Sequence, residues 1–168
     1  MQPRGYPARL YFYGCMEIGK AIQQTRFRND RQKAIVNILY THGWLMERIK
    51  GHFGNAGITP QQYNILRILR GSHPTPLTVL DLKSRMLDKN CDASRLIERL
   101  ILKGFVKKKP CSNDKRRVDI VINPKGLELL AKLDEQDQMM DNILQGLTVE
   151  EAAELSRLLD KLRSCESE

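Results

Sequence analysis

The stretch that decides the fold is Leu77–Gly126, which reads LTVLDLKSRMLDKNCDASRLIERLILKGFVKKKPCSNDKRRVDIVINPKG. Its start predicts a short helix, because the Thr78 hydroxyl and the Asp81 carboxylate have the spacing of a capping box. Leu77 and Leu82 occupy the two positions of a hydrophobic staple, which fixes the entry of the chain into such a helix. The beginning of the stretch therefore predicts a capped and stapled helix.

The remainder of the stretch predicts a second helix and a hairpin. The helix covers residues 90–100 and stops at Lys103-Gly104, a cation followed by glycine. Residues 105–109 predict a basic strand, residues 110–114 a turn, and residues 118–122 an alternating strand. Two helices followed by a basic two-stranded ribbon form the plan of a winged helix-turn-helix, which indicates DNA as the partner.

The distribution of charge agrees with a polyanionic partner. The net charge is +8, but residues 1–126 hold 24 basic and 9 acidic side chains, whereas residues 127–168 hold 4 basic and 11 acidic ones. Basic residues concentrate at Lys107–Lys109 and Lys115–Arg117, on both sides of the predicted turn, where they suit phosphates and a minor groove. A merely solvated surface is the alternative, and it leaves this concentration unexplained.

Length and composition exclude several classes of protein. A chain of 168 residues with 41% apolar content has room for one domain with a core, or for a small domain with helical extensions. No apolar run approaches the roughly 20 residues that span a bilayer. Residues 1–15 lack the apolar segment and cleavage site of a signal peptide. We expect a cytoplasmic protein with no membrane partner.

The four cysteines show no metal-binding spacing. They are scattered at Cys15, Cys91, Cys111 and Cys165, and the three histidines form no i,i+4 pair, so we expect free thiols, no metal site and no cofactor. Cys91 lies near the start of the second predicted helix, where the helix dipole and Lys89 would favour a thiolate. A redox role for Cys91 is one hypothesis, and an inert thiol is the simpler one.

Outside the winged stretch, apolar spacing and capping signals predict further helices, six main ones in all. Residues 31–53 carry apolar side chains on two faces, and a loop is expected at residues 51–57. A capping box with proline at the first helical position starts a helix at Thr59. A long helix is predicted from Asn123 through Leu144, and a last one from a further capping box at Thr148.

These helices flank the winged stretch on both sides, which suggests that they close a dimer; a monomeric bundle is the alternative. The expected organisation is an N-terminal extension (1–22) that could be flexible, a dimerisation region (23–56), a winged helix-turn-helix DNA-binding domain (57–126) and C-terminal dimerisation helices (127–168). The fold class is mainly α with a small β-wing.

The order of these motifs resembles the MarR-type (multiple antibiotic resistance regulator) transcription factors. The resemblance is carried by the Leu-Thr-x-x-x-Leu helix, by residues 94–100 in the recognition helix, by Lys-Gly-Phe-Val-Lys-Lys at 103–108 and by the wing at 114–126. It covers roughly residues 31–163. Asn123-Pro124 stands where the family usually has Thr-Glu, but asparagine caps helices well and proline suits the first helical position.

The resemblance implies a homodimer that occupies a near-palindromic operator in double-stranded DNA, usually as a repressor. It also implies DNA-binding residues. Those at the start of the recognition helix would meet the major groove: Lys89, Asn90, Cys91, Asp92, Ser94 and Arg95. Those of the wing would contact the minor groove and phosphates, with Asp114 holding Arg116: Lys107, Asp114, Lys115, Arg116 and Arg117. Asp114 could equally serve only to form the turn.

The resemblance also bears on a small-molecule effector. The family often binds small aromatic or phenolic ligands, and candidate residues here are His42, Trp44, Met46 and Tyr63, each of which could instead be an ordinary packing residue. No nucleophile–base constellation, phosphate-binding loop or His-Glu-x-x-His pattern is present, so we do not expect an enzyme. Two alternatives stay open: a thiol-based redox regulator of the same fold, and a non-specific architectural DNA-binding protein.

Overall fold

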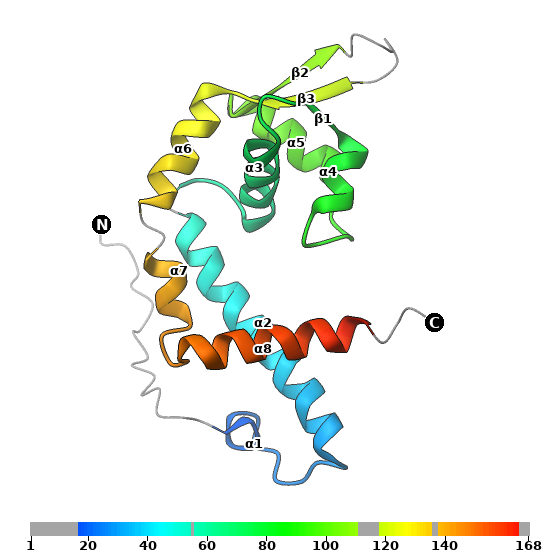
Figure 1. Ribbon diagram of the computed structural model, residues 1–168, viewed down its shortest axis with the longest axis vertical. Helices are drawn as coiled ribbons and strands as arrows, with labels where there is room; N and C mark the ends of the chain where they lie inside the picture. Colours follow the sequence, from blue (N-terminus) through cyan, green and yellow to red (C-terminus); the bar gives the residue numbers. More distant parts are fainter. Residues whose placement is uncertain (1–16, 55, 111–117, 136–137, 165–168) are drawn as a thin grey trace, which may run out of the picture. The chain divides into compact units, whose positions relative to one another are not determined.

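The computed structural model describes residues 17–54, 56–110, 118–135 and 138–164. Within these ranges the chain forms eight helices and one small antiparallel sheet of three strands (Figure 1), which confirms the predicted fold class. The chain divides into two compact units, one ending at Trp44 and the other beginning at Leu45. In the described ranges, none of the helices has both the length and the apolar character that crossing a membrane requires.

The first unit contains α1 (Ile18–Ala21) and the amino-terminal part of α2 (Asp30–Gly54). An ion pair between Lys33 Nζ and Glu17 Oε1, 2.8 Å long, joins α2 to the residue before α1. Several apolar side chains of this part of α2 are exposed, among them Leu39. The described part of this unit, taken by itself, therefore leaves apolar side chains uncovered.

The predicted helix at residues 31–53 is confirmed, but the loop expected at residues 51–57 begins too early. Helix α2 continues to Gly54, because the buried side chain of Phe53 anchors its last turn. The backbone N–H of Ala56 then donates to the carbonyl of Phe53 at 3.1 Å and closes the turn.

The second unit holds the winged lobe, by which we mean the segment from α3 to α6. Its elements in chain order are α3 (Pro60–Ser72), β1 (Leu77–Thr78), α4 (Val79–Arg85), α5 (Ala93–Leu102), β2 (Val106–Pro110), β3 (Val118–Ile122) and α6 (Pro124–Asp134). Helices α3, α4 and α5 lie together on one side of the sheet, as Figure 1 shows. One helical layer therefore covers one face of the sheet.

Two capping boxes start α3 and α4, and both predictions are confirmed. Thr59 Oγ1 accepts from the backbone N–H of Gln62 at 3.2 Å, while Gln62 Oε1 accepts from the backbone N–H of Thr59 at 3.1 Å. Thr78 and Asp81 make the same reciprocal pair at 3.1 and 3.0 Å. Each box satisfies two amide donors that the first helical turn leaves without partners.

The sheet has one strand more than the predicted two-stranded ribbon. Its order is β1-β3-β2, with both pairs antiparallel, so β3 is the central strand. Leu77 pairs with Ile120 across β1 and β3, and both side chains are buried. The ribbon prediction was wrong on this point, because a strand of two residues has no alternating pattern to detect.

The core of the winged lobe is built from alternating sheet residues and one stripe of each helix. Its fully buried apolar members are Ile65, Leu66, Leu69, Leu82, Met86, Ile97, Leu100, Val106, Ile120 and Leu130. Buried apolar surface is the main stabilising contribution to a domain of this size. The lobe therefore has a contiguous core of its own.

The turn from β3 into α6 requires glycine at position 126. A Cβ on Gly126 would lie 2.5 Å from the carbonyl oxygen of Phe105, which no side chain tolerates. Asn123 is the N-cap residue of α6 as predicted, but its side chain makes no capping bond. Its amide instead donates to the carbonyl of Gly104 at 3.2 Å, so it fastens α6 to the end of α5.

The long helix predicted through Leu144 is interrupted. Helix α6 ends at Asp134, α7 covers Gln138–Ile143, and α8 covers Val149–Ser164. The heptad spacing of Leu133, Met140 and Leu147 therefore does not describe one continuous helix. The capping box at Thr148 is confirmed, since Thr148 Oγ1 accepts from the backbone N–H of Glu151 at 3.2 Å.

Candidate nucleic-acid interface

The amino-terminal end of α5 is fixed by side chains of the preceding turn. Asp92 is the N-cap residue, and its Oδ1 accepts from the backbone N–H of Arg95 at 3.0 Å. Asp88 Oδ1 accepts from the backbone N–H of Asn90 at 3.0 Å, which shapes the turn between α4 and α5. Asn64 Oδ1 on α3 accepts from the backbone N–H of Leu87 at 3.0 Å. The helix-turn-helix is thus held at both ends of its turn.

Helix α5 has one buried face and one outward face. Ala93, Ile97 and Leu100 are buried against the core. The outward face, as we use the term, consists of Ser94, Arg95, Glu98, Arg99 and Leu102, all of which are exposed. This face offers two guanidinium groups and one hydroxyl, which are donors suited to phosphate oxygens and guanine edges.

The residues expected to contact the major groove differ in their availability. Lys89 Nζ donates to the carbonyl of Ser84 at the end of α4. The carboxylate of Asp92 is engaged in capping, and Cys91 is half-buried. All of the predicted set except Cys91 are exposed: Lys89, Asn90, Asp92, Ser94 and Arg95.

Cys91 lies in a different electrostatic environment from the one expected. Its Sγ donates to the carbonyl of Asp88 at 3.0 Å and lies 3.4 Å from Met86 Sδ. Burial raises the pKa of the Cys91 thiol, and the negative charge of Asp88 acts in the same direction. This direction is opposite to the one expected from the helix dipole and Lys89, which were predicted to favour a thiolate.

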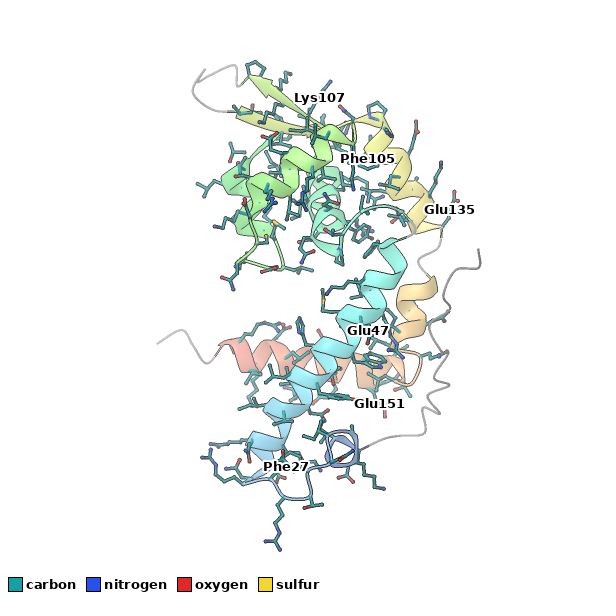
Figure 2. The ribbon with its side chains drawn as sticks, turned by 180° about the vertical axis from the view of Figure 1, so that it is seen from behind. Phe27, Glu47, Phe105, Lys107, Glu135 and Glu151 are labelled. Carbon is teal, nitrogen blue, oxygen red and sulfur yellow. The ribbon has the colours of Figure 1, made fainter. Side chains whose placement is uncertain are left out.

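The three lysines of β2 do not share one face of the sheet. Side chains alternate along a strand, so Lys108 lies on the same side as the buried Val106, while Lys107 and Lys109 lie on the opposite side. Lys108 Nζ forms an ion pair with Glu98 Oε1 on α5. Figure 2 labels Lys107 on β2. The predicted wing residues Asp114, Lys115, Arg116 and Arg117 lie outside the described residues.

A pocket of about 280 Å³ opens between the start of α3 and the outward face of α5. Its lining consists of residues at the start of α3 and at the start and along one side of α5: Thr59, Gln61, Cys91, Asp92, Arg95, Leu96 and Arg99. None of the four residues proposed from the sequence as effector contacts lines this pocket.

The four candidate effector residues fall in both compact units. His42 is exposed and Trp44 is half-buried in the first unit. Met46 is half-buried in the second, where the ring of Tyr63 stacks on Phe53 at a centroid distance of 4.3 Å. The Tyr63 hydroxyl accepts from Arg67 Nη1 at 3.0 Å. In the described part of the chain, no group of histidines, cysteines and carboxylates has the geometry of a metal site.

Sequence reasoning missed two ion-pair systems in the lobe. One is the Lys108–Glu98 pair between β2 and α5. The other is Asp134 at the end of α6, which accepts from Arg67 at 3.0 Å and from Arg70 at 2.5 Å on α3. Both systems join residues that belong to different elements. In the sequence, only the basic run at residues 107–109 pointed to one member of either pair.

A helical lobe whose exposed second helix lies beside a basic strand of a small sheet defines a winged helix-turn-helix protein. A family model described as the MarR family matches residues 58–118. A MarR transcription factor from Planctomyces limnophilus, known from its crystal structure, is 31% identical and covers 80% of this chain and 98% of its own, with a TM-score of 0.63. The chain belongs to the MarR family of transcription regulators.

Two further crystal structures show the same fold. A cysteine-to-serine mutant of MarR from E. coli, complexed with operator DNA, is 22% identical and covers 82% of this chain and 99% of its own, with a TM-score of 0.70. An organohalide-sensing transcriptional regulator in the 2,4-dichlorophenol-bound form is 20% identical. The match covers 94% of this chain and 89% of that regulator's chain, with a TM-score of 0.74.

Proposed function

We propose that the protein binds operator DNA as a homodimer in the cytoplasm and represses transcription until a small aromatic or phenolic effector releases it. The observation that carries the proposal is the outward face of α5, where Arg95 and Arg99 are exposed beside the lysine-rich strand β2. Arginine donors on a helix that follows a helix-turn-helix suit base edges in the major groove. The operator-bound relative of the same fold supports this assignment.

Exposed leucines on α8 support the homodimer. Helix α8 buries no residue, and Leu155, Leu158 and Leu162 are exposed on one stripe. Apolar side chains that recur at helical spacing without a covering surface favour association with a second helix. A twofold dimer would present two winged lobes to two half-sites of one operator.

The proposed effector is a small phenolic molecule. The relative in its 2,4-dichlorophenol-bound form has the same fold, which favours a phenolic ligand for this chain too. His42, Trp44, Met46 and Tyr63 remain its proposed contacts. Isothermal titration with 2,4-dichlorophenol, followed by measurement of DNA release, would test this part separately.

The first experiment selects a duplex from a random pool with the purified protein and measures binding by fluorescence anisotropy across salt concentrations. The expected result is salt-sensitive binding that prefers the selected duplex to a scrambled one by about 10³-fold or more. Equal affinity for both duplexes would identify a non-specific architectural protein instead. No binding at low salt would remove DNA binding altogether.

Arg95→Ala tests the proposed contact on α5. Losing a guanidinium that binds a base or phosphate is expected to weaken specific binding by about 1–3 kcal/mol without changing the melting temperature. Arg157→Ala on α8 is the matched control, because it removes the same charge from a residue paired with Glu154 outside the winged lobe. If Arg95→Ala and Arg157→Ala bind the selected duplex equally well, α5 is not the recognition helix.

A thiol-based regulator is the remaining alternative, and the chemistry at Cys91 disfavours it. A raised pKa keeps this cysteine as a thiol, whereas the thiolate is the form that reacts with oxidants. Treating the DNA complex with hydrogen peroxide would decide the matter: release of DNA that Cys91→Ser prevents would establish the thiol mechanism.

A further inference from the structure

Glu98 is the only acidic residue within α5, and it lies on the outward face proposed to meet DNA. It follows Ser94 by four residues and Arg95 by three, so the three side chains occupy neighbouring positions on the helix. Duplex DNA carries one negative charge per roughly 1.7 Å of its axis. A free carboxylate at this position would therefore repel the ligand that its neighbours attract.

The carboxylate of Glu98 is not free. Lys108 Nζ on β2 forms an ion pair with Glu98 Oε1, and the two side chains are 49% and 55% exposed, respectively. Lys108 reaches α5 because it lies on the helix side of the sheet, whereas Lys107 and Lys109 lie on the other side. The strand thus directs one of its three lysines to the recognition helix.

Stability is a poor explanation for this pair. An exposed lysine–glutamate pair contributes little to the folding free energy, because water screens the charges and two long side chains lose freedom. The pair also joins the two elements of the lobe, α5 and the first strand of the wing, that winged proteins present together to a duplex. Its effect should therefore be sought in binding.

We propose that Lys108 acts in DNA binding through Glu98: it neutralises the negative charge of Glu98 on the recognition helix. The inference rests on the proposed DNA-binding function and deepens it. The ion pair offsets the charge of Glu98 enough to allow DNA binding. The carboxylate that remains still lowers the affinity for DNA of any sequence. Lys108 acts through Glu98, whereas Lys107, on the opposite face, has no part in this pair.

A double-mutant cycle measured on DNA affinity tests the proposal. The proteins are wild type, Glu98→Gln, Lys108→Met and the double variant, each titrated by anisotropy with the selected and the scrambled duplex. Lys108→Met is expected to weaken binding about tenfold in the wild-type background but at most about twofold in the Glu98→Gln background, because the carboxylate it exposes is then absent. Glu98→Gln alone should strengthen binding to both duplexes about threefold.

Lys107→Met, alone and with Glu98→Gln, is the matched control. It removes the same charge one residue away on the opposite face, so its effect should be equal in both backgrounds. Lys108→Arg retains the positive charge and should bind within about twofold of wild type. Melting curves followed by circular dichroism should be unchanged for all variants, because both members of the pair are half exposed.

Three outcomes would overturn the inference. Equal losses from Lys108→Met in both backgrounds would make Lys108 an independent phosphate contact. Loss of affinity in Glu98→Gln for the selected duplex alone would make Glu98 a base contact, since carboxylates accept from cytosine. A large fall in melting temperature without an effect on binding would make the pair structural. If wild type binds neither duplex, the proposed function itself fails, and that result is distinct from an additive cycle.

Discussion

The winged lobe and helix α8 differ in whether any of their leucines form a buried core. In the lobe, Leu66 and Leu100 are fully buried. On α8, no residue is buried, and Leu158 and Leu162 are 48% and 57% exposed. The lobe completes a core within one chain, whereas the leucines of α8 stay available to a partner surface. Buried leucines therefore contribute to folding in the lobe, whereas the exposed leucines of α8 are the ones proposed to contribute to association.

This difference separates two properties that the proposed dimeric regulator would combine. The residues proposed to contact DNA, such as Arg95, stand on a helix whose other face belongs to a completed core. Helix positions are held more accurately by such packing than by loops. We therefore expect substitutions in the lobe core to change the stability of the lobe and to have little effect on association. Substitutions on α8 should change association and have little effect on the stability of the lobe.

The largest effect is expected from Leu100→Ala in the lobe core. Leu100 has no exposed surface and lies on the buried face of α5. Removing its side chain loses buried apolar area and leaves a cavity, which should lower the free energy of unfolding by about 3–4 kcal/mol. Urea unfolding at pH 7, followed by circular dichroism, measures this change.

Leu102→Ala is the matched control, because it makes the same substitution two residues further along the same helix. Leu102 is 86% exposed, so the variant should unfold within about 0.5 kcal/mol of wild type. Similar losses in both variants would mean that the buried and outward faces of α5 have been assigned wrongly.

A charge on the leucine stripe of α8 should give the next largest effect. Leu158→Glu would place a carboxylate in the proposed dimer interface and raise the dimer dissociation constant about 30-fold, or about 2 kcal/mol. Sedimentation velocity over a range of protein concentrations measures this constant. The winged lobe should melt as in wild type when both are compared as monomers.

Ser156→Glu adds the same charge two residues away, on the other side of α8, and should leave the dimer intact. Wild-type protein that remains monomeric at all concentrations would contradict the homodimer itself. Equal weakening by the two glutamates would place the interface elsewhere on the helix.

The features that sequence predicted well depend on interactions within a few residues. The capping boxes at Thr59 and Thr78, and the stop at Lys103-Gly104, each need only neighbouring side chains and one backbone geometry. The same holds for the strand at residues 118–122. Local rules identified these elements because their hydrogen bonds close within one helical turn or one strand.

Features that depend on distant partners were not predictable in the same way. Strand β1 pairs with β3 about forty residues later, and two residues are too few to show a pattern. The amide of Asn123 binds Gly104 instead of capping its own helix. The heptad spacing of apolar residues continues past Asp134, but helix α6 ends there. Such spacing is compatible with a continuous helix but does not require one.

The candidate site also has features that depend on local sequence and features that depend on more distant partners. The exposed positions of Ser94 and Arg95 follow from the period of α5, which sequence reveals. The capping role of Asp92 and the raised pKa of Cys91 depend on neighbouring groups across a turn. The partnership of Lys108 with Glu98 depends on how β2 packs on α5, and composition alone showed only a cluster of lysines.

The smallest effect is expected at Asp134, where the lobe ends. Its carboxylate stands at the carboxyl end of α6, which the helix dipole disfavours, and is retained there by Arg70 and Arg67 of α3. The hydrogen bond from Arg70 is the main reason that the pKa of Asp134 lies below its ordinary value. Because the group is partly exposed, Asp134→Asn should lower the free energy of unfolding by only about 1 kcal/mol at pH 7.

The pH dependence of that loss identifies its cause. A carboxyl group whose folded pKa is lowered stabilises the protein above its unfolded pKa, and the contribution disappears as pH falls through the folded pKa. The difference between wild type and Asp134→Asn should therefore be constant from about pH 7 to 5 and shrink progressively as the pH falls further. Asp160→Asn, which breaks an ion pair with Arg163 on α8, should cost about 0.3 kcal/mol or less. If the difference in unfolding free energy between wild type and Asp134→Asn stays the same at low pH, the stabilisation at this end of the lobe comes from hydrogen bonds of a neutral carboxyl group. The ion pairs with the two arginines would then not be its cause.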